Sequence, residues 1–201
     1  MIKESLKENY VRCWAFMKEC RWFFVFAFGL FSLMFLVGFL FPVFFREEIF
    51  KMIEMLMLEI EGKGAFELIS FIFLNNLQAS FMAMVLGFLV GVFPLVVCVV
   101  NGYLLGFVAR EAVVVEGIFA MWKILPHGIF ELPAVIFSIG MGLRLGSQVV
   151  RGGLGRLRED GKGKESVGYV FRESLRVFVF VVFPLLVVAG IVEGILIGFT
   201  N

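Results

Sequence analysis

The segment 68–109 contains no charged residue over 42 positions, and no other feature of the sequence constrains the fold as strongly. About 20 apolar residues in a helix, rising about 1.5 Å each, cross the hydrocarbon core of a bilayer. The segment is therefore long enough for two crossings. Gly91 and Pro94 are the residues within it that favour a turn, so the sequence predicts spans at 68–90 and 94–110.

The composition of the chain also indicates an integral membrane protein. Hydrophobic residues make up 61% of the 201 positions, and 27 residues are Phe, whereas soluble domains are about 45–50% apolar. The net charge of +1 gives no general attraction to nucleic acid, so none is expected as a partner. The three cysteines have no CxxC spacing and are not expected to form a disulfide framework: Cys13, Cys20 and Cys98.

Three further apolar segments bring the predicted number of spans to five. They cover residues 22–45, 126–146 and 177–199. The first is interpreted as a retained anchor because no small-residue cleavage site follows it. The sequence therefore predicts a single all-α membrane domain over residues 1–201, with about five transmembrane helices.

The segments between the spans differ in character. Residues 1–21 and 46–67 place charged and apolar residues at helical spacing, which predicts amphipathic helices on the membrane surface. Residues 110–125 are too short for a further crossing and are expected to form a re-entrant or interfacial piece. The Gly-rich, basic segment 147–174 is expected to be a linker that either contacts anionic lipid headgroups or is solvated.

The distribution of Lys and Arg predicts the orientation in the membrane. If the N-terminus is cytoplasmic, the cytoplasmic segments hold thirteen of these residues and the external segments hold five. This arrangement follows the positive-inside rule. The sequence therefore predicts a multi-pass protein of the cell membrane with a cytoplasmic N-terminus and an external C-terminus.

Four of the predicted spans place strongly polar side chains in the external half of the membrane, judged from their positions along each helix. An ionised carboxylate in the centre of a membrane helix costs about 3 kcal/mol, so these side chains should face one another, a partner or water. We expect an intramembrane polar cluster of Asn75, Asn76, Asn101, His127, Glu131 and Glu193.

Three interpretations of this cluster remain open. It could be a set of hydrogen bonds that holds the helices together, a site for a proton or ion, or the centre of a hydrolase. A bound metal ion would use His127, Glu131 and Glu193, with Asn or water completing the site. The hydrolase rests only on the HxxxE spacing, which differs from the HExxH of zinc proteases, so no enzymatic activity is expected.

Small residues recur at helical spacing on the same spans. In lipid they let helix backbones approach closely, so they are predicted to lie at helix–helix contacts. They also predict a homo-oligomer, and a dimer through the first or last span is the expected form. The glycines concerned are Gly87, Gly91, Gly102, Gly106, Gly142, Gly146, Gly190 and Gly194.

These features together resemble the stage II sporulation protein M family of multi-span membrane proteins. The resemblance rests on the order and spacing of motifs between about residues 65 and 200. The PHGxxE motif that begins at Pro126 is the most specific of them. The other motifs are Asn75-Asn76, Gly87 with Gly91, Asn101-Gly102 with Leu105-Gly106, Gly140-x-Gly142-Leu143-x-Leu145-Gly146, and Ile191-x-Glu193-Gly194.

The resemblance implies a non-enzymatic scaffold with membrane or envelope proteins as partners. In spore-forming bacteria, the family member looks like the membrane-embedded scaffold of an engulfment complex that includes two peptidoglycan-degrading proteins. The family also extends to organisms that do not sporulate. The polar cluster supports an alternative, a small ion, proton or metal channel or transporter with an outward-facing site.

Overall fold

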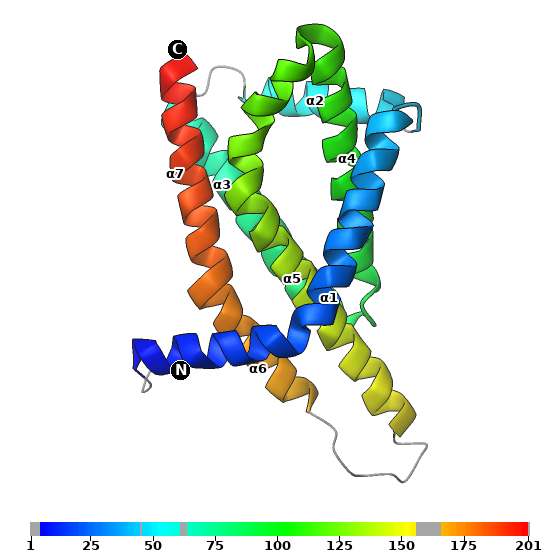
Figure 1. Ribbon diagram of the computed structural model, residues 1–201, viewed down its shortest axis with the longest axis vertical. Helices are drawn as coiled ribbons and strands as arrows, with labels where there is room; N and C mark the ends of the chain where they lie inside the picture. The colour runs from blue at the N-terminus through cyan, green and yellow to red at the C-terminus, as the bar shows by residue number, and fades with distance from the viewer. Residues whose placement is uncertain (1–4, 45, 61–63, 156–165, 201) are drawn as a thin grey trace.

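The computed structural model describes residues 5–44, 46–60, 64–155 and 166–200, apart from several side chains near the helix ends. Within these residues the chain is helical and has no strand (Figure 1). Five helices are long and apolar enough to cross a membrane, which confirms the predicted all-α membrane class. The helices are α1 Leu6–Leu40, α2 Arg46–Ile60, α3 Ala65–Val85, α4 Val92–Glu116, α5 Met121–Gly155, α6 Val167–Val177 and α7 Phe183–Thr200.

The long helices run between two ends of a bundle, which we call the α2 end and the α6 end after the short helices that lie there (Figure 1). The turn between α4 and α5 and the C-terminal turns of α7 lie at the α2 end. The first turns of α1 lie across the α6 end. Helix α5 is central, because it packs against α1, α3, α4 and α7.

Helix α1 joins the predicted surface helix and the first span without a break. It begins with a capping box, in which Glu8 N donates to Ser5 Oγ (3.3 Å) and Ser5 N donates to Glu8 Oε2 (2.9 Å). It ends at Leu40, earlier than the predicted residue 45. Pro42 explains this end, since it disfavours helical backbone at the preceding residue, Phe41.

A tight turn that contains the 3₁₀ helix Ile118–Ala120 joins α4 to α5, so most of residues 110–125, predicted as a re-entrant or interfacial piece, belong to the ends of these two helices. Gly117 begins the turn and has a φ of +81°, a conformation that glycine adopts readily. The charged residues after the apolar span do not end α4 but extend it, and Glu111 there pairs with Arg46 of α2 at 3.5 Å. Helices α4 and α5 therefore form a hairpin at the α2 end.

Helix α5 extends beyond the predicted span 126–146 at both ends. Residues 147–151 contain no glycine or proline, so nothing in them ends the helix, and part of the predicted linker 147–174 is helical. Residues 156–165 of that linker lie outside the described residues. Helices α6 and α7 are continuous through a wider π-helical turn, Phe178–Val182, which accommodates Pro184.

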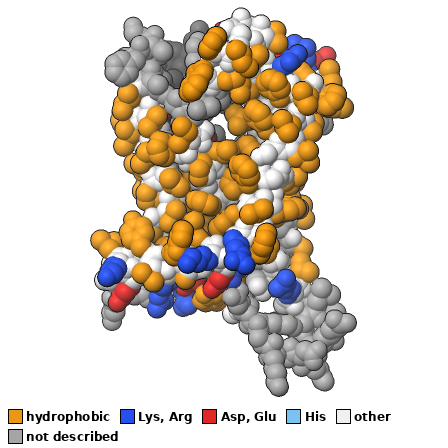
Figure 2. Space-filling model, in the orientation of Figure 1, with side chains coloured by type: hydrophobic (Ala, Val, Ile, Leu, Met, Phe, Trp, Pro, Cys, Tyr) orange, Lys and Arg blue, Asp and Glu red, His pale blue; other side chains and the backbone are white. Residues whose placement is uncertain are grey.

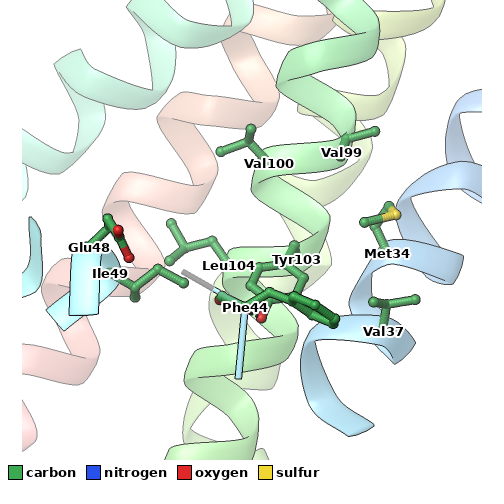
Figure 3. A pocket seen from close by; sticks show the side chains of 9 residues that line it. All are labelled: Met34, Val37, Phe44, Glu48, Ile49, Val99, Val100, Tyr103 and Leu104. Carbon is green, nitrogen blue, oxygen red and sulfur yellow. Dashed lines mark hydrogen bonds between the residues drawn. The ribbon is translucent and has the colours of Figure 1, made fainter. Parts of the chain in front are cut away.

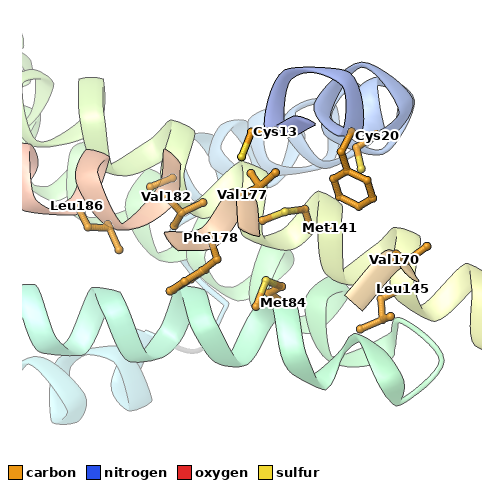
Figure 4. Close-up of a cluster of buried hydrophobic side chains, with 12 residues drawn as sticks. Cys13, Cys20, Met84, Met141, Leu145, Val170, Val177, Phe178, Val182 and Leu186 are labelled. Carbon is orange, nitrogen blue, oxygen red and sulfur yellow. The ribbon is translucent and has the colours of Figure 1, made fainter. Parts of the chain in front are cut away.

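The larger buried hydrophobic cluster lies where the first turns of α1 cross the α6 end (Figure 4). It joins segments that are far apart in the sequence, and it holds the surface part of α1 against the bundle. Its buried members include Cys13, Phe16, Cys20, Met84, Met141, Leu145, Val170, Val177, Phe178, Val182 and Leu186. All three cysteines are buried and free.

Glycines bring α5 into backbone contact with α3 and with the turn that follows it. A Cβ atom added to Gly87 would overlap the backbone of Gly142, and one added to Gly142 would overlap the carbonyl oxygen of Ala83. Gly91, with φ +77°, forms the turn into α4 and lies against Gly146. No residue larger than glycine fits at Gly87, Gly142 or Gly146 without a backbone shift.

Helices α1 and α4 approach each other in the same way. A Cβ atom on Gly102 or Gly106 would meet the backbone of α1, and one on Gly38, which the sequence did not single out, would meet the backbone of α4. Gly190 is less tightly packed, because the nearest atom is 3.6 Å from its added Cβ. The surroundings of Gly194 lie outside the described residues.

Replacement of Gly142 by Ala is expected to lower the free energy of unfolding by about 1–3 kcal/mol, because the methyl group must displace backbone atoms of α3. The control is Gly152→Ala on the same helix, where an added Cβ meets nothing within 4 Å. The control should be neutral or slightly stabilising, since alanine favours a helix. Denaturant titrations in a mild detergent, followed by circular dichroism, measure both. Equal stability of the two variants would contradict the packing described here.

Candidate functional site

Asn101 of α4 and Glu131 of α5 line the same small cavity, whose volume is about 140 Å³. The cavity lies between α1, α4 and α5, and its α5 residues belong to the first half of that helix, which begins at the α2 end. Its other lining residues are apolar or small: Phe31, Leu105, Gly128, Leu132 and Val135. Two polar side chains on different spans therefore line one cavity, which is partly open, and Asn101 itself is exposed.

The Asn101 side chain is partly engaged by its own helix. Its Nδ2 donates to the carbonyl oxygen of Val97, one turn earlier, at 2.8 Å. An amide group has two donor hydrogens and an acceptor oxygen, so this bond uses only part of its capacity. The remainder can serve a ligand or a water molecule in the cavity.

Glu131 interacts electrostatically with Glu193 of α7. Glu131 is half-buried, and Glu193 is only 8% exposed. The carboxyl groups of Glu131 and Glu193 therefore lie on neighbouring helices, close enough to interact electrostatically. Two ionised carboxylates so placed would repel each other in a region of low dielectric.

The other residues of the expected cluster are placed differently. Asn76 is half-buried on α3, whereas Asn75 is exposed on the outside of the bundle. The side chain of His127 lies outside the described residues. In the part of the chain that the structure describes, no three His, Cys, Asp or Glu side chains approach closely enough to hold a metal ion. A site made of His127, Glu131 and Glu193 thus remains a prediction.

The cavity does not continue toward the α6 end along α5. Residues 138–146 of that helix are all buried, and only Ser138 and Arg144 among them carry polar side chains. Ser138 Oγ donates to the carbonyl oxygen of Ala134 at 2.9 Å. The glycine contacts described above bring the neighbouring backbones against this stretch. The cavity is therefore bounded on this side by a closely packed stretch of α5.

A second polar group, centred on Arg144, was not recognised from the sequence. Arg144 is 4% exposed, its Nη2 donates to Glu19 Oε2 at 2.8 Å, and its guanidinium lies 4.4 Å from the ring centre of Phe16. Nη1 of Arg144 also donates to Cys20 Sγ at 3.2 Å. This arginine thus joins α5 to the first turns of α1. The available signal was its position within an apolar, glycine-rich helix, where a charge requires a partner.

The same junction contains a second ion pair on α6. Arg176 and Glu173 are both buried and form a direct ion pair, and Arg172 approaches the same carboxylate at 3.5 Å. Arg144 and Arg176, two of the thirteen basic residues on which the predicted orientation rests, are therefore part of the packed junction between α1, α5 and α6.

An apolar cavity of about 440 Å³ lies between α1, α2 and α4 (Figure 3). Tyr103 shapes it, because its hydroxyl donates to the carbonyl oxygen of Phe44 at 2.7 Å and thereby holds the α1–α2 connection against α4. Glu48 is the charged residue in its lining. This volume is within the range of ligand sites, but the lining offers few polar groups to orient a ligand.

Comparison with known proteins identifies a family. The family model described as stage II sporulation protein M matches residues 22–196, a range that includes every residue of the expected polar cluster. An uncharacterized protein of Methanocaldococcus jannaschii is 33% identical over 120 residues, which is 60% of this chain and 51% of that protein. The match spans about half the length of that relative. No solved structure matches the chain significantly.

Replacement of Arg144 by Met is expected to destabilise the protein by about 2–3 kcal/mol. This is less than the loss of a fully buried ion pair, because the side chain of Glu19 is 43% exposed and remains solvated. Arg151→Met, at an exposed position of the same helix, should change stability by less than about 0.5 kcal/mol. Denaturant titration of both variants is the measurement, and an equally small effect in both would show that the Arg144 contacts do not stabilise the junction.

Proposed function

Because this chain belongs to the stage II sporulation protein M family, we propose that it is a non-enzymatic membrane scaffold that assembles other membrane or envelope proteins. The protein is a multi-pass membrane protein of that family. The observation that carries the proposal is the closed packing of residues 138–146 in the middle of the bundle. Close helix packing in the described part of the bundle suits a protein that holds partners.

The distribution of exposed charges supports a cytoplasmic N-terminus. Figure 2 shows Lys and Arg side chains gathered at the α6 end, over the first turns of α1. Trp14 and Trp22, both exposed, lie among these charges, and Trp is typical of the membrane–water interface. By the positive-inside rule, the positive charge at the α6 end supports a cytoplasmic α6 end and an external α2 end. The exposed basic residues of α1 are Lys7, Arg12, Lys18 and Arg21.

A second candidate function rests on a different observation, the electrostatic contact of Glu131 with Glu193 beside a cavity that Asn101 also lines. Acidic side chains inside a membrane commonly mark proton or ion pathways. In the proposed orientation this cavity lies in the external half. The second candidate is therefore a transporter or channel for protons or cations whose site opens outward.

Loss of a scaffold should lower the abundance of its partners, because proteins that depend on binding for stability are degraded without it. Deletion of the gene is expected to deplete the same small set of membrane proteins in replicate quantitative proteomes. Glu131→Gln combined with Glu193→Gln should restore their abundance, whereas Gly142→Leu, which cannot pack against α3, should not. An unchanged membrane proteome after deletion, or failure of the double Gln variant to restore it, would argue against the scaffold.

Flux measurements in reconstituted liposomes test the second candidate. It predicts that the wild-type protein conducts protons or divalent cations and that Glu193→Gln abolishes this flux by removing an ionisable group from the cavity region. Glu54→Gln, at an exposed position of α2, is the control and should conduct as the wild type does. Liposomes with wild-type protein that are no leakier than empty liposomes would exclude this candidate.

A further inference from the structure

The outer face of α3 carries amide side chains where lipid is expected. Four residues form a stripe at spacings of three, four and seven, and all are exposed: Asn75, Gln78, Ala79 and Met82. They belong to the span Ile69–Phe88. Helix α3 packs against α5 and α7 through its other faces. The stripe is thus turned away from the bundle.

The amides of this stripe have no partner within the described part of the chain. No side-chain hydrogen bond of Asn75 or Gln78 is formed there. Gln78 lies near the middle of its span, about 14 Å along the helix from Ile69, so its side chain cannot reach the surface. An amide in hydrocarbon without a hydrogen bond is strongly unfavourable, and membrane helices satisfy such groups by bonding to another helix.

The surface beside the stripe is shaped to receive a helix. An apolar groove of about 470 Å³ runs between α3 and α7, and Gln78 is part of its wall. Ala79, on the stripe itself, has a small side chain that permits close approach. The other residues that line the groove are Leu74, Leu77, Phe81, Phe178 and Phe183.

We propose that this face of α3 is the contact surface for a second copy of the chain, in a parallel two-fold dimer. Two copies inserted in the same orientation can be related by a two-fold axis along the membrane normal, which sets each α3 beside the other at equal depth. Asn75 and Gln78 then lie opposite the same residues of the second copy. Because an amide both donates and accepts, each pair can satisfy itself, whereas an unrelated helix would need matching polar residues at both levels.

This inference does not rest on the proposed function, since a scaffold and a transporter could each be dimeric. It differs from the dimer through the first or last span that the small residues of the sequence predict. The amides on α3 favour this helix because they need hydrogen-bond partners, which the exposed apolar faces of α1 and α7 do not.

Oxidative cross-linking in native membranes tests the contact. Ala79→Cys is expected to give a disulfide-linked species of twice the 22.7 kDa chain mass with copper phenanthroline. Val100→Cys, on an exposed face of α4, is the control and should stay monomeric. The native cysteines are at most 2% exposed, so they need not be removed. No cross-link at Ala79, equal cross-linking of the control, or an adduct of another mass would overturn the proposal, the last by identifying a different protein on this face.

Association measured by energy transfer in liposomes tests the role of the amides. Asn75→Leu or Gln78→Leu should raise the dimer dissociation constant about threefold each, and the double variant about tenfold. Asn75→Gln retains an amide and should stay close to the wild type. Because both positions are exposed, circular dichroism should show each variant folded. A double Leu variant that associates as tightly as the wild type would overturn the proposal even if Ala79→Cys cross-links.

Discussion

Backbone contact between α5 and its neighbours is the constraint on which the rest of this structure depends. Lipid tails are as apolar as leucine, so burial of apolar surface between spans provides little net free energy, and close van der Waals contact must hold them together. Gly142 and Gly146 let α5 touch the end of α3 and the turn into α4. Residues 138–146 are all buried as a result. The candidate cavity and the ion pairs of the α6 end are described by their positions relative to this packed stretch.

The charged side chains at the two ends of the bundle have different kinds of neighbour. At the α6 end, opposite charges meet, as Arg144 does with Glu19 and Arg176 with Glu173. Toward the α2 end, two acids interact beside a cavity. Opposite charges neutralise each other, so these ion pairs need no role beyond stabilising the junction, although their burial has a desolvation cost. Two acids inside a membrane repel each other, and the second candidate function would reside at this pair.

The approximate positions of the five spans could be predicted, because hydrocarbon thickness fixes the length of an apolar run. The helix ends could not, because charged residues outside the membrane continue a helix as readily as they end it, as α4 does after Arg110. Depth along each helix indicated that Asn101 and Glu131 lie at a common level. Rotation about the helix axis was not predictable where a span is apolar on every side, so the sequence did not reveal that Asn75 is exposed or that Arg144 is buried.

Because the described chain has five candidate crossings, the first turns of α1 and the last turns of α7 lie at opposite ends of the bundle (Figure 1). If one gene encoded two such units joined directly head to tail, the second unit would enter the bilayer upside down. Its α3 would then run antiparallel to the first, with unlike residues at each depth. Only separately synthesised chains can therefore pair identical surfaces side by side. Two units encoded in a single reading frame would need an additional crossing between them to pair in the same way.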